Sequence, residues 1–583
     1  MDALKKSLFL FCMLALTVSG CVSPAATQPP SGVVEITAPP EAAATSASAV
    51  TEAPAATELP AATESPSAKP VILKIGWPGK PDTLNPAYAF LTESYTVFDL
   101  VYGGLTTESP EGGYVGELAK EWKQSDDGLT WTFTLKDGIK FHNGEDFTAD
   151  DMAWAINAVM ADPEGWATLA NYASGFTAVK AVDPKTVQIT LEKPISNMEY
   201  RVSFLYAFYR KDFEGFKTAE ELQNFANDMP IGTGAFKVNT FDKDKGILIL
   251  DANRDFYGGA PKVDQVIFQT FDNADAMVQA LKVGDIDVAM EIPNSAFDTL
   301  KSAENVKLVD QPGRGLAELI INTVPANHDP APTRNPALED PQVRLALATA
   351  INKQDLVDIV LQGYGAPGVT IIPPSLGGGF WYNPIQDVTF DLAKANQILE
   401  DAGYVKGSDG IRAKGEVRLE FRLQYASDST LYPRIADLMS NWWREVGIKA
   451  NPESVDPDSL TAAVTPTGDY DLVIWGWGSD PDPDFMLSVM TSDQFVEGGW
   501  SDSGYSNPEY DQLYLDQQTT IDKNARQKIV WKMQEMIYNA RPYIVLYYER
   551  QLEAFRSDRF KGFIESPLGI EISLSLRQVE AVK

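Results

Sequence analysis

The sequence predicts an α/β protein with two large lobes, and three observations support this prediction. The chain has 583 residues, of which 44% are hydrophobic, so it can bury a large core but is too long for one compact unit. Strand-like and helix-like patterns alternate after about residue 70, which is typical of α/β lobes. No internal repeat of fixed period occurs, so a string of similar modules is not expected.

The N-terminus is typical of an export signal. A positively charged start precedes an apolar stretch, residues 8–18, that is too short to span a bilayer stably. Val18-Ser19-Gly20-Cys21 resembles a bacterial lipobox, in which the signal is cut before the cysteine and the cysteine carries lipid. We therefore expect residues 1–20 to be a lipoprotein signal peptide and Cys21 to be the lipidation site. The alternative is ordinary secretory cleavage, which would leave Cys21 as a free thiol.

Residues 21–70 are predicted to be a disordered tether. They consist almost entirely of Ala, Pro, Thr, Ser and Glu and include no aromatic residue, so they cannot bury enough apolar surface to offset chain entropy. A flexible chain of this length spans on the order of 40 Å. We expect an extracytoplasmic protein, lipid-anchored to the cell membrane and facing the periplasm or the outer cell surface.

Charge and composition exclude several classes of site. The net charge is −33, from 48 basic and 81 acidic residues, which argues against nucleic acid as a partner. An acidic surface keeps a secreted protein soluble; alternatively, part of the excess charge attracts cationic ligands. The chain has only two cysteines, Cys12 and Cys21, and two histidines, His142 and His328. We therefore expect no metal site, no cofactor and no catalytic residues.

The first half of the folded body reads as strands with one clear helix start. Residues 71–77 form an apolar strand, and residues 129–135 alternate polar and apolar side chains as a half-buried strand does. After a turn at residues 140–144, Thr148 with Asp151 three residues later predicts a capping box that opens a helix. Further strands are predicted at residues 187–191, 247–250 and 266–268.

The second half repeats the alternation of helices and strands. Asp391 before residues 392–400 and Gly403 after them mark the two ends of one helix. The other predicted helices are residues 343–351, 434–446 and 524–538. The predicted strands are residues 419–425, 470–477 and 544–548.

An acidic loop follows the strand at residues 470–477. It reads Ser479-Asp480-Pro481-Asp482-Pro483-Asp484, and Asp482 before Pro483 fits the cap and first position of a helix that opens at Phe485. Asp484 would then lie in the first turn, where the helix dipole favours an anion. Asp480 has no comparable structural explanation.

The segments together resemble bacterial extracellular solute-binding proteins of family 5, which feed ABC importers. The matching stretches are DTLNP from residue 82, VYGGL from 101, LAKEW from 118, DGLTWTF from 127, FHNGEDFTADD from 141, PIGTGAF from 230, NRDFYGG from 253, GDID from 284, VRLA from 343, AGY from 402, GWGSD from 476, YSNP from 505 and RPYI from 541. No single stretch is specific, but their order covers nearly the whole folded body.

The resemblance implies a two-lobed, periplasmic-binding-protein-like fold with a hinge and an extra subdomain in one lobe. Its discontinuous layout would divide the chain as follows: lobe I from residues 71–110, 206–310 and 554–583, the extra subdomain from residues 111–205, and lobe II from residues 311–553. The resemblance also implies a monomer that closes its lobes over a ligand and delivers the ligand to the permease subunits of an ABC importer.

The resemblance singles out Asp480 as a ligand-binding residue. In the peptide-binding members, the aspartate at the matching position pairs with the α-ammonium group of the ligand, because a desolvated ammonium needs a carboxylate partner. The alternative for Asp480 is a solvated loop carboxylate or a second cap. The further candidates for the pocket are Trp475, Trp477, Trp500, Tyr425, Asp428, Asn85 and Tyr88, and each has core packing or loop structure as an alternative.

The expected function is solute binding rather than catalysis. The sequence has no Gly-x-Ser-x-Gly elbow, no Gly-Lys-Ser/Thr phosphate loop and no His-Glu-x-x-His motif. A peptide or similar small solute is the expected ligand, and nickel or haem is less expected because imidazole ligands are scarce. With 12 Trp and 22 Tyr, an oligosaccharide is the main alternative ligand. A secreted carboxylate-based hydrolase is the alternative from another functional class.

Overall fold

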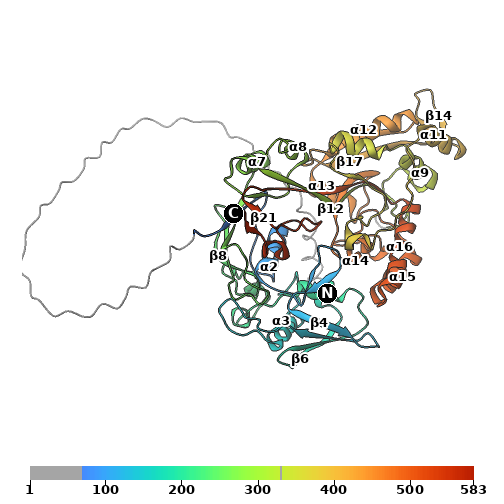
Figure 1. The fold of residues 1–583 in the computed structure, drawn as a ribbon. Coiled ribbons are helices and arrows are strands. Elements are labelled where there is room, and N and C mark those ends of the chain that lie inside the picture. Colours follow the sequence, from blue (N-terminus) through green and yellow to red (C-terminus); the bar gives the residue numbers. More distant parts are fainter. Residues whose placement is uncertain (1–68, 329–330) are drawn as a thin grey trace, which may run out of the picture. The chain divides into compact units, whose positions relative to one another are not determined.

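The computed structural model describes residues 69–328 and 331–583. The predicted signal peptide, Cys21 and nearly all of the predicted tether lie outside the described residues. Within these two ranges, no helix combines the length and apolarity needed to cross a membrane. The predicted alternation of strands and helices is confirmed, and the elements are traced in Figure 1.

The largest sheet has eleven strands and runs through the two halves of the described chain. One half-sheet contains β18 (Lys449–Val455), β17 (Glu420–Ala426) and β19 (Leu472–Gly478). The other half-sheet contains β11 (Val288–Ala289), β1 (Ile72–Trp77), β10 (Gln265–Thr270), β9 (Ile247–Ala252) and β8 (Phe236–Asp242). The first half-sheet is called the C-terminal half-sheet below, and the second the N-terminal half-sheet.

Two long strands join the half-sheets. β12 (Val306–Ile321) pairs with β19, β20 (Tyr543–Arg556) pairs with β11, and the two long strands pair with each other in antiparallel register. The short β13 (Ala366–Pro367) also pairs with β20. The register between β12 and β20 shifts between Pro312 and Leu316 and again at Ala317 and Glu318, and such irregularities bend and twist a ladder. The fold is thus two-lobed α/β, with continuous strands between the lobes.

Both faces of β12 are covered by apolar clusters, as its sequence requires. Ala317, Leu319 and Ile321 belong to one buried cluster, whereas Leu316 and Ile320 belong to another. This two-residue period places alternate side chains on opposite faces of the sheet. The helices that accompany the C-terminal half-sheet are α9 (Pro341–Thr349), α11 (Leu392–Asp401), α12 (Tyr432–Glu445), α13 (Pro457–Val464), α14 (Asp484–Ser488), α15 (Pro508–Thr519) and α16 (Lys523–Ala540). α15 and α16, drawn in red in Figure 1, pack against each other.

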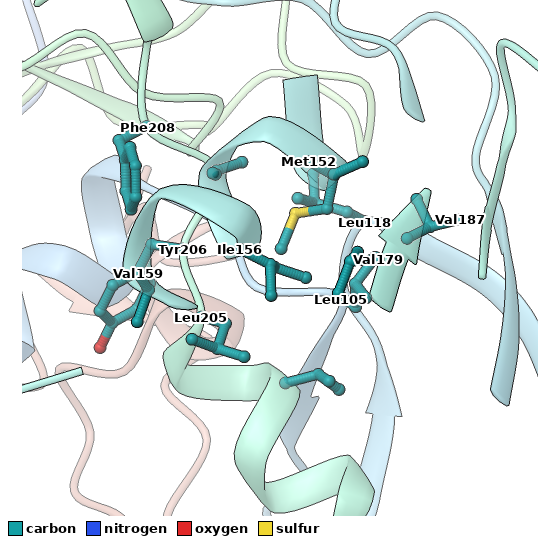
Figure 2. Close-up of a cluster of buried hydrophobic side chains, with 14 of the residues drawn as sticks. Leu105, Leu118, Met152, Ile156, Val159, Val179, Val187, Leu205, Tyr206 and Phe208 are labelled. Carbon is teal, nitrogen blue, oxygen red and sulfur yellow. The ribbon is translucent and has the colours of Figure 1, made fainter. Parts of the chain in front are cut away.

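A separate four-stranded antiparallel sheet lies within the first half of the chain. Its order is β4 (Ala119–Gln124), β5 (Thr130–Leu135), β7 (Thr186–Leu191) and β6 (Phe176–Asp183). The helix α3 (Ala149–Ala161) packs on it, and Figure 2 shows Met152 and Ile156 among the apolar side chains between them. The predicted start of α3 is confirmed, because the backbone N–H of Thr148 donates to the Asp151 carboxylate at 2.8 Å.

The remaining elements are short. The helices outside the C-terminal half are α2 (Thr92–Val101), α4 (Met198–Phe204), α5 (Arg210–Phe213), α6 (Ala219–Gln223), α7 (Ala274–Val283), α8 (Asn294–Asp298) and the last one, α17 (Ser573–Leu576). The small sheets are β2 (Thr106–Glu108) with β3 (Tyr114–Gly116), β14 (Val405–Lys406) with β15 (Arg412–Lys414) and β16 (Val417–Arg418), and β21 (Phe560–Lys561) with β22 (Glu580–Ala581).

Candidate functional site

The candidate residues of the second half gather at one edge of the C-terminal half-sheet. β17 and β19 are parallel neighbours, with Tyr425 opposite Ile474, so their carboxyl ends lie at the same edge. The loop with Asp428 follows β17, and the acidic loop of residues 479–483 follows β19. Ligands of open α/β sheets bind at such carboxyl ends. The topology therefore brings Tyr425, Asp428 and Asp480 to one side of the sheet.

Asp480 is held by a tyrosine from the other half of the chain. The hydroxyl of Tyr200, on α4, donates to the Asp480 carboxylate at 2.8 Å. Burial raises the pKa of Asp480, and the nearby Asp482 and Asp484 raise it further, whereas Tyr200 and Arg314 oppose this effect. Asp480 is therefore a desolvated carboxyl with one hydrogen bond to a neutral donor, and an added cation would favour its charged form.

Other contacts join the same two parts of the chain. Arg314, on β12, forms a half-buried ion pair with Glu108, at the end of β2. The backbone N–H of Ser196 donates to the carbonyl of Gln518 at 2.9 Å. Gly112, with φ of +94°, approaches the other half so closely that a β-carbon there would lie 2.5 Å from the carbonyl carbon of Gly377. Asp480 therefore lies at an interface between the two halves rather than on an open loop.

Sequence reasoning missed three residues around Asp480. Tyr200, Tyr114 and Arg314 carry no motif, and all three are distant from Asp480 in sequence. The hydroxyl of Tyr114 is buried without a hydrogen-bond partner among the described residues, and burial together with Glu108 raises its pKa.

The prediction for Asp482 is only partly correct. Its carboxylate accepts a hydrogen bond from the backbone N–H of Asp484 at 3.0 Å, as a cap would, but α14 begins at Asp484 and Pro483 occupies the cap position. Its main partner is Arg526, with oxygen–nitrogen distances of 2.6 and 2.7 Å. Asp482 is therefore an anchor for the acidic loop.

Asp484 lies in the first turn of α14, as predicted. Its carboxylate accepts a hydrogen bond from the side-chain amide of Gln517 at 2.5 Å. Asp484 is thus bound to α15, whereas Asp480 is bound to the hydroxyl of Tyr200 on α4.

Aromatic side chains form a connected row beside the acidic loop. Trp477 contacts Phe485 edge to face with ring centroids 5.8 Å apart, and Phe485 contacts Trp500 in the same way at 5.6 Å. The indole N–H of Trp477 donates to the Asp502 carboxylate at 3.1 Å, and burial raises the pKa of Asp502 to about 7. Trp475, Trp477 and Trp500 are all half-buried, so each keeps part of its surface accessible. We call Trp477, Phe485 and Trp500, together with Trp475 two positions before Trp477 on β19, the aromatic row.

The other four predicted residues differ in their surroundings. Asn85 is fully buried; its amide donates to the Leu222 carbonyl at 2.7 Å and accepts from the N–H of Ala87 at 3.0 Å, which is a structural arrangement. Tyr88 is 37% exposed and packs edge to face on Phe90. Tyr425 is buried in the core beside α12, and Asp428 is exposed.

His142 is engaged in backbone hydrogen bonds. Its Nδ1 accepts from the N–H of Gly232 at 3.3 Å, so its Nε2 donates to the Gly234 carbonyl at 3.1 Å. Burial lowers the pKa of His142 to about 4, which keeps the ring neutral. Across the described ranges, no group of three or more His, Cys, Asp or Glu side chains is arranged to hold a metal ion.

Comparison with known proteins identifies similar chains over most of this length. Residues 113–497 match the family described as "Bacterial extracellular solute-binding proteins, family 5 Middle". The chain is 27% identical to the oligopeptide-binding protein AppA of Bacillus subtilis, over 82% of this chain and 86% of AppA. It is 25% identical to heme-binding protein A of Haemophilus influenzae, over 78% and 82% of the two chains. The structure of NikZ from Campylobacter jejuni in complex with Ni(L-His) superposes with a TM-score of 0.71 at 25% identity, covering 87% of this chain and 99% of NikZ.

Proposed function

The chain belongs to the bacterial extracellular solute-binding proteins of family 5, and from this premise we propose that it captures peptides or similarly sized small solutes between its two lobes for an ABC importer. Members of this family are substrate-binding transport proteins rather than enzymes, and we infer the same for this chain. The proposed partners are the permease subunits of the importer and, through lipid on Cys21, the cell membrane. The proposed binding unit is a monomer.

The contact between Tyr200 and Asp480 carries the proposal for the ligand. It places a desolvated carboxylate at the interface of the two halves, where closing lobes would exclude water. An α-ammonium group would donate charge-assisted hydrogen bonds to Asp480, and such bonds are stronger than the bond from the neutral tyrosine. The Tyr200 hydroxyl can stay on the same carboxylate, because a carboxylate accepts several hydrogen bonds. A peptide N-terminus therefore fits this position.

The proposed contact residues around Asp480 come from the edge of the C-terminal half-sheet. Trp475, Trp477 and Trp500 would contact the body of the ligand through their accessible faces, and Asp428 lies at the same edge. Tyr425 would support this wall from the core. For Asn85 the structural arrangement is the better explanation, and Tyr88 has no contact that links it to Asp480 among the hydrogen bonds and ring contacts of the described residues.

Thermal unfolding of the full-length chain in detergent tests this proposal. The probes are a pool of tripeptides, a pool of cello-oligosaccharides, and Ni²⁺. A ligand at about 100 times its dissociation constant adds about 2.7 kcal/mol of stability, which raises the unfolding midpoint clearly. We expect the tripeptides to raise it, the variant Asp480→Asn to lose this effect, and the exposed control Asp126→Asn to keep it. Equal shifts for Asp480→Asn and the parent protein would contradict the role of Asp480.

An oligosaccharide is the second candidate ligand, because the aromatic row offers several accessible rings. Sugars bind through flat contacts with such rings together with hydrogen bonds from polar groups. A midpoint shift with the cello-oligosaccharides alone, lost in Trp477→Ala, would favour this candidate over peptides. The hydrolase alternative predicts release of reducing sugar or amine from these probes, and we expect none.

A further inference from the structure

Glu318 is a buried carboxyl group without a hydrogen-bond partner among the described residues. It lies on β12 and has no exposed surface, and no hydrogen-bond donor from the described residues reaches either of its carboxylate oxygens. A carboxylate transferred from water into such a place loses its hydration without compensation. Asp482, which is buried to a similar extent, is compensated by Arg526. No described residue offsets the burial of Glu318 in its ionised form.

The strand register places Glu318 beside the aromatic row. Glu318 is paired with Trp475 on β19 and with Val545 on β20, and directly paired residues of neighbouring strands share a face of the sheet. Leu316, two residues before Glu318, is paired with Trp477. Trp475 and Trp477 are only half-buried, so a bound molecule would contact the face that Glu318 shares with them.

Further unpaired polar atoms lie on the loops at this edge. The hydroxyls of Ser479 and Ser501 are buried and have no hydrogen-bond partner among the described residues. Ser479 directly precedes Asp480, and Ser501 lies between Trp500 and Asp502. Buried polar groups in native proteins are normally satisfied, so unsatisfied hydroxyls on these loops are available to a bound molecule. A polar ligand at this edge would supply hydrogen-bond partners for these hydroxyls.

We propose that Glu318 is a second anionic subsite, which binds a second cationic group of the ligand against the indole of Trp475. The preferred ligand would then be a dication, with one ammonium at Asp480 and an ammonium or guanidinium at Glu318. This inference rests on the proposed function, because it takes the same cleft as the binding site. A cation at this position would gain both a charge-assisted hydrogen bond and contact with an aromatic face.

The spacing of the two acids fits an extended chain of a few residues. Trp475 lies three residues before the end of β19, which corresponds to about 10 Å along the strand, and Asp480 follows two residues later. An arginine or lysine side chain adds several ångströms of reach to a peptide backbone. Tetrapeptides with the basic residue at the second, third or fourth position therefore sample the relevant distances between the N-terminal ammonium and the side-chain cation.

Occupation by a cation is expected to release a proton. Burial raises the pKa of Glu318 well above its usual value, and the carboxylates of Asp502 and Glu549 raise it further. The other titratable groups that sense Glu318 are the phenols of Tyr432 on α12 and of Tyr543 and Tyr547 on β20. These phenols stay neutral because burial raises their pKa values. Burial therefore favours the protonated form of Glu318, and a bound cation would favour its ionised form.

Calorimetry with matched peptide pairs tests the proposal. The full-length chain is titrated with alanine tetrapeptides that carry arginine at position two, three or four, and with the same peptides carrying citrulline, the neutral analogue of arginine. Titrations at pH 7 in two buffers of different ionisation enthalpy measure proton release. Spermidine serves as a free polycation, which separates a peptide source from a polyamine source. The variants are Glu318→Gln, which keeps the shape and removes the charge, and Glu304→Gln, an exposed glutamate that controls for net charge.

We expect the best arginine peptide to bind at least about tenfold more tightly than the matching citrulline peptide, both to the parent protein and to Glu304→Gln. Binding of the arginine peptide to these two proteins should release protons. In Glu318→Gln, the two peptides should bind equally and proton release should disappear. Equal affinities in the parent protein would overturn the second subsite and leave peptide binding at Asp480 intact. If spermidine binds to the parent protein but not to Glu318→Gln, and no peptide binds, the cation subsite at Glu318 is supported and the peptide proposal fails. If no probe distinguishes Glu318→Gln from the parent protein, the subsite is wrong.

Discussion

Asp482 and Arg526 form a buried ion pair with two parallel hydrogen bonds, 2.6 and 2.7 Å long. The side-chain oxygen of Gln517 accepts from the same guanidinium at 2.9 and 3.0 Å, so both partners are almost fully satisfied. The two residues are 4% and 2% exposed. This pair connects the acidic loop to α16 and holds the backbone on which Asp480 lies.

Loss of one partner of this pair should destabilise the fold strongly. We expect Asp482→Asn to lower the free energy of unfolding by about 3–5 kcal/mol, because it leaves the Arg526 guanidinium buried without a counter-charge. Urea unfolding at pH 7 measures this change. Asp480→Asn, two residues away, provides the comparison and should cost less than about 1.5 kcal/mol, because Tyr200 can still donate to the amide oxygen. Equal losses in the two variants would contradict the different roles assigned to these aspartates.

Two glutamates near the end of the chain should make stability depend on pH. Glu553, on β20, is fully buried, and burial raises its pKa and that of the adjacent Glu571. An acid with a raised pKa in the folded state stays protonated while the unfolded chain ionises. Its stabilising contribution is therefore complete below about pH 4.3, the value for unfolded glutamate, and falls as the pH rises through the folded-state pKa.

Glu553→Gln should remove part of this pH dependence. As the pH rises from 4.5 to 8, the free energy of unfolding should fall less in the variant than in the parent protein. The difference should reach up to about 1.4 kcal/mol for each pH unit over which this glutamate is ionised only in the unfolded chain. Urea midpoints at a series of pH values measure the difference, and the exposed Glu304→Gln serves as the control. A parallel pH profile for Glu553→Gln and the parent protein would show that Glu553 ionises normally in the folded state.

Asp502 should give a spectroscopic signal through Trp477. Burial raises its pKa to about 7, and its carboxylate accepts a hydrogen bond from the indole N–H of Trp477. The fluorescence of Trp477, obtained as the difference between the parent protein and Trp477→Phe, should therefore change with a midpoint near pH 7. Asp502→Asn should abolish the change. A midpoint near pH 4 would show that the carboxyl of Asp502 is well solvated.

The proposed lipid anchor predicts a difference between the two cysteines. Cys21→Ser should prevent lipidation and shift the protein from the detergent phase to the aqueous phase in Triton X-114 partition. Cys12→Ser lies within the predicted signal peptide and should leave partition unchanged. Aqueous partition of the parent protein, with Cys21 reactive toward a thiol probe, would instead support ordinary secretory cleavage.

Local patterns in the sequence predicted the elements well. The alternation at residues 129–135 gave β5, observed as Thr130–Leu135, and the Thr148–Asp151 pair gave the start of α3. These features depend on neighbouring residues, so the sequence pattern contains the information needed. Strand β12 was not predicted, because its sequence includes Pro312, two glycines, Arg314 and Glu318.

The surroundings of the site could not be predicted in the same way. The sequence predicts a cap at Asp482 because the partner of Asp482, Arg526, lies 44 residues away, and Tyr200 lies 280 residues from Asp480. Such contacts depend on how the half-sheets and helices are placed in space, which local periodicity does not specify. A stronger signal was available for Glu318, since a glutamate within the apolar run Leu316 to Ile321 is costly to bury and invites a functional explanation.

The position of β20 between β12 and β11 also sets an order of events during biosynthesis. Every other strand of the eleven-stranded sheet precedes residue 543, so β1 can pair with β10 and β17 with β19 while the chain is still emerging N-terminus first. The two partial sheets cannot be joined until Tyr543–Arg556 has been made. The strand that joins the two half-sheets is therefore among the last segments of the fold to be synthesised, and the eleven-stranded sheet is completed only after it.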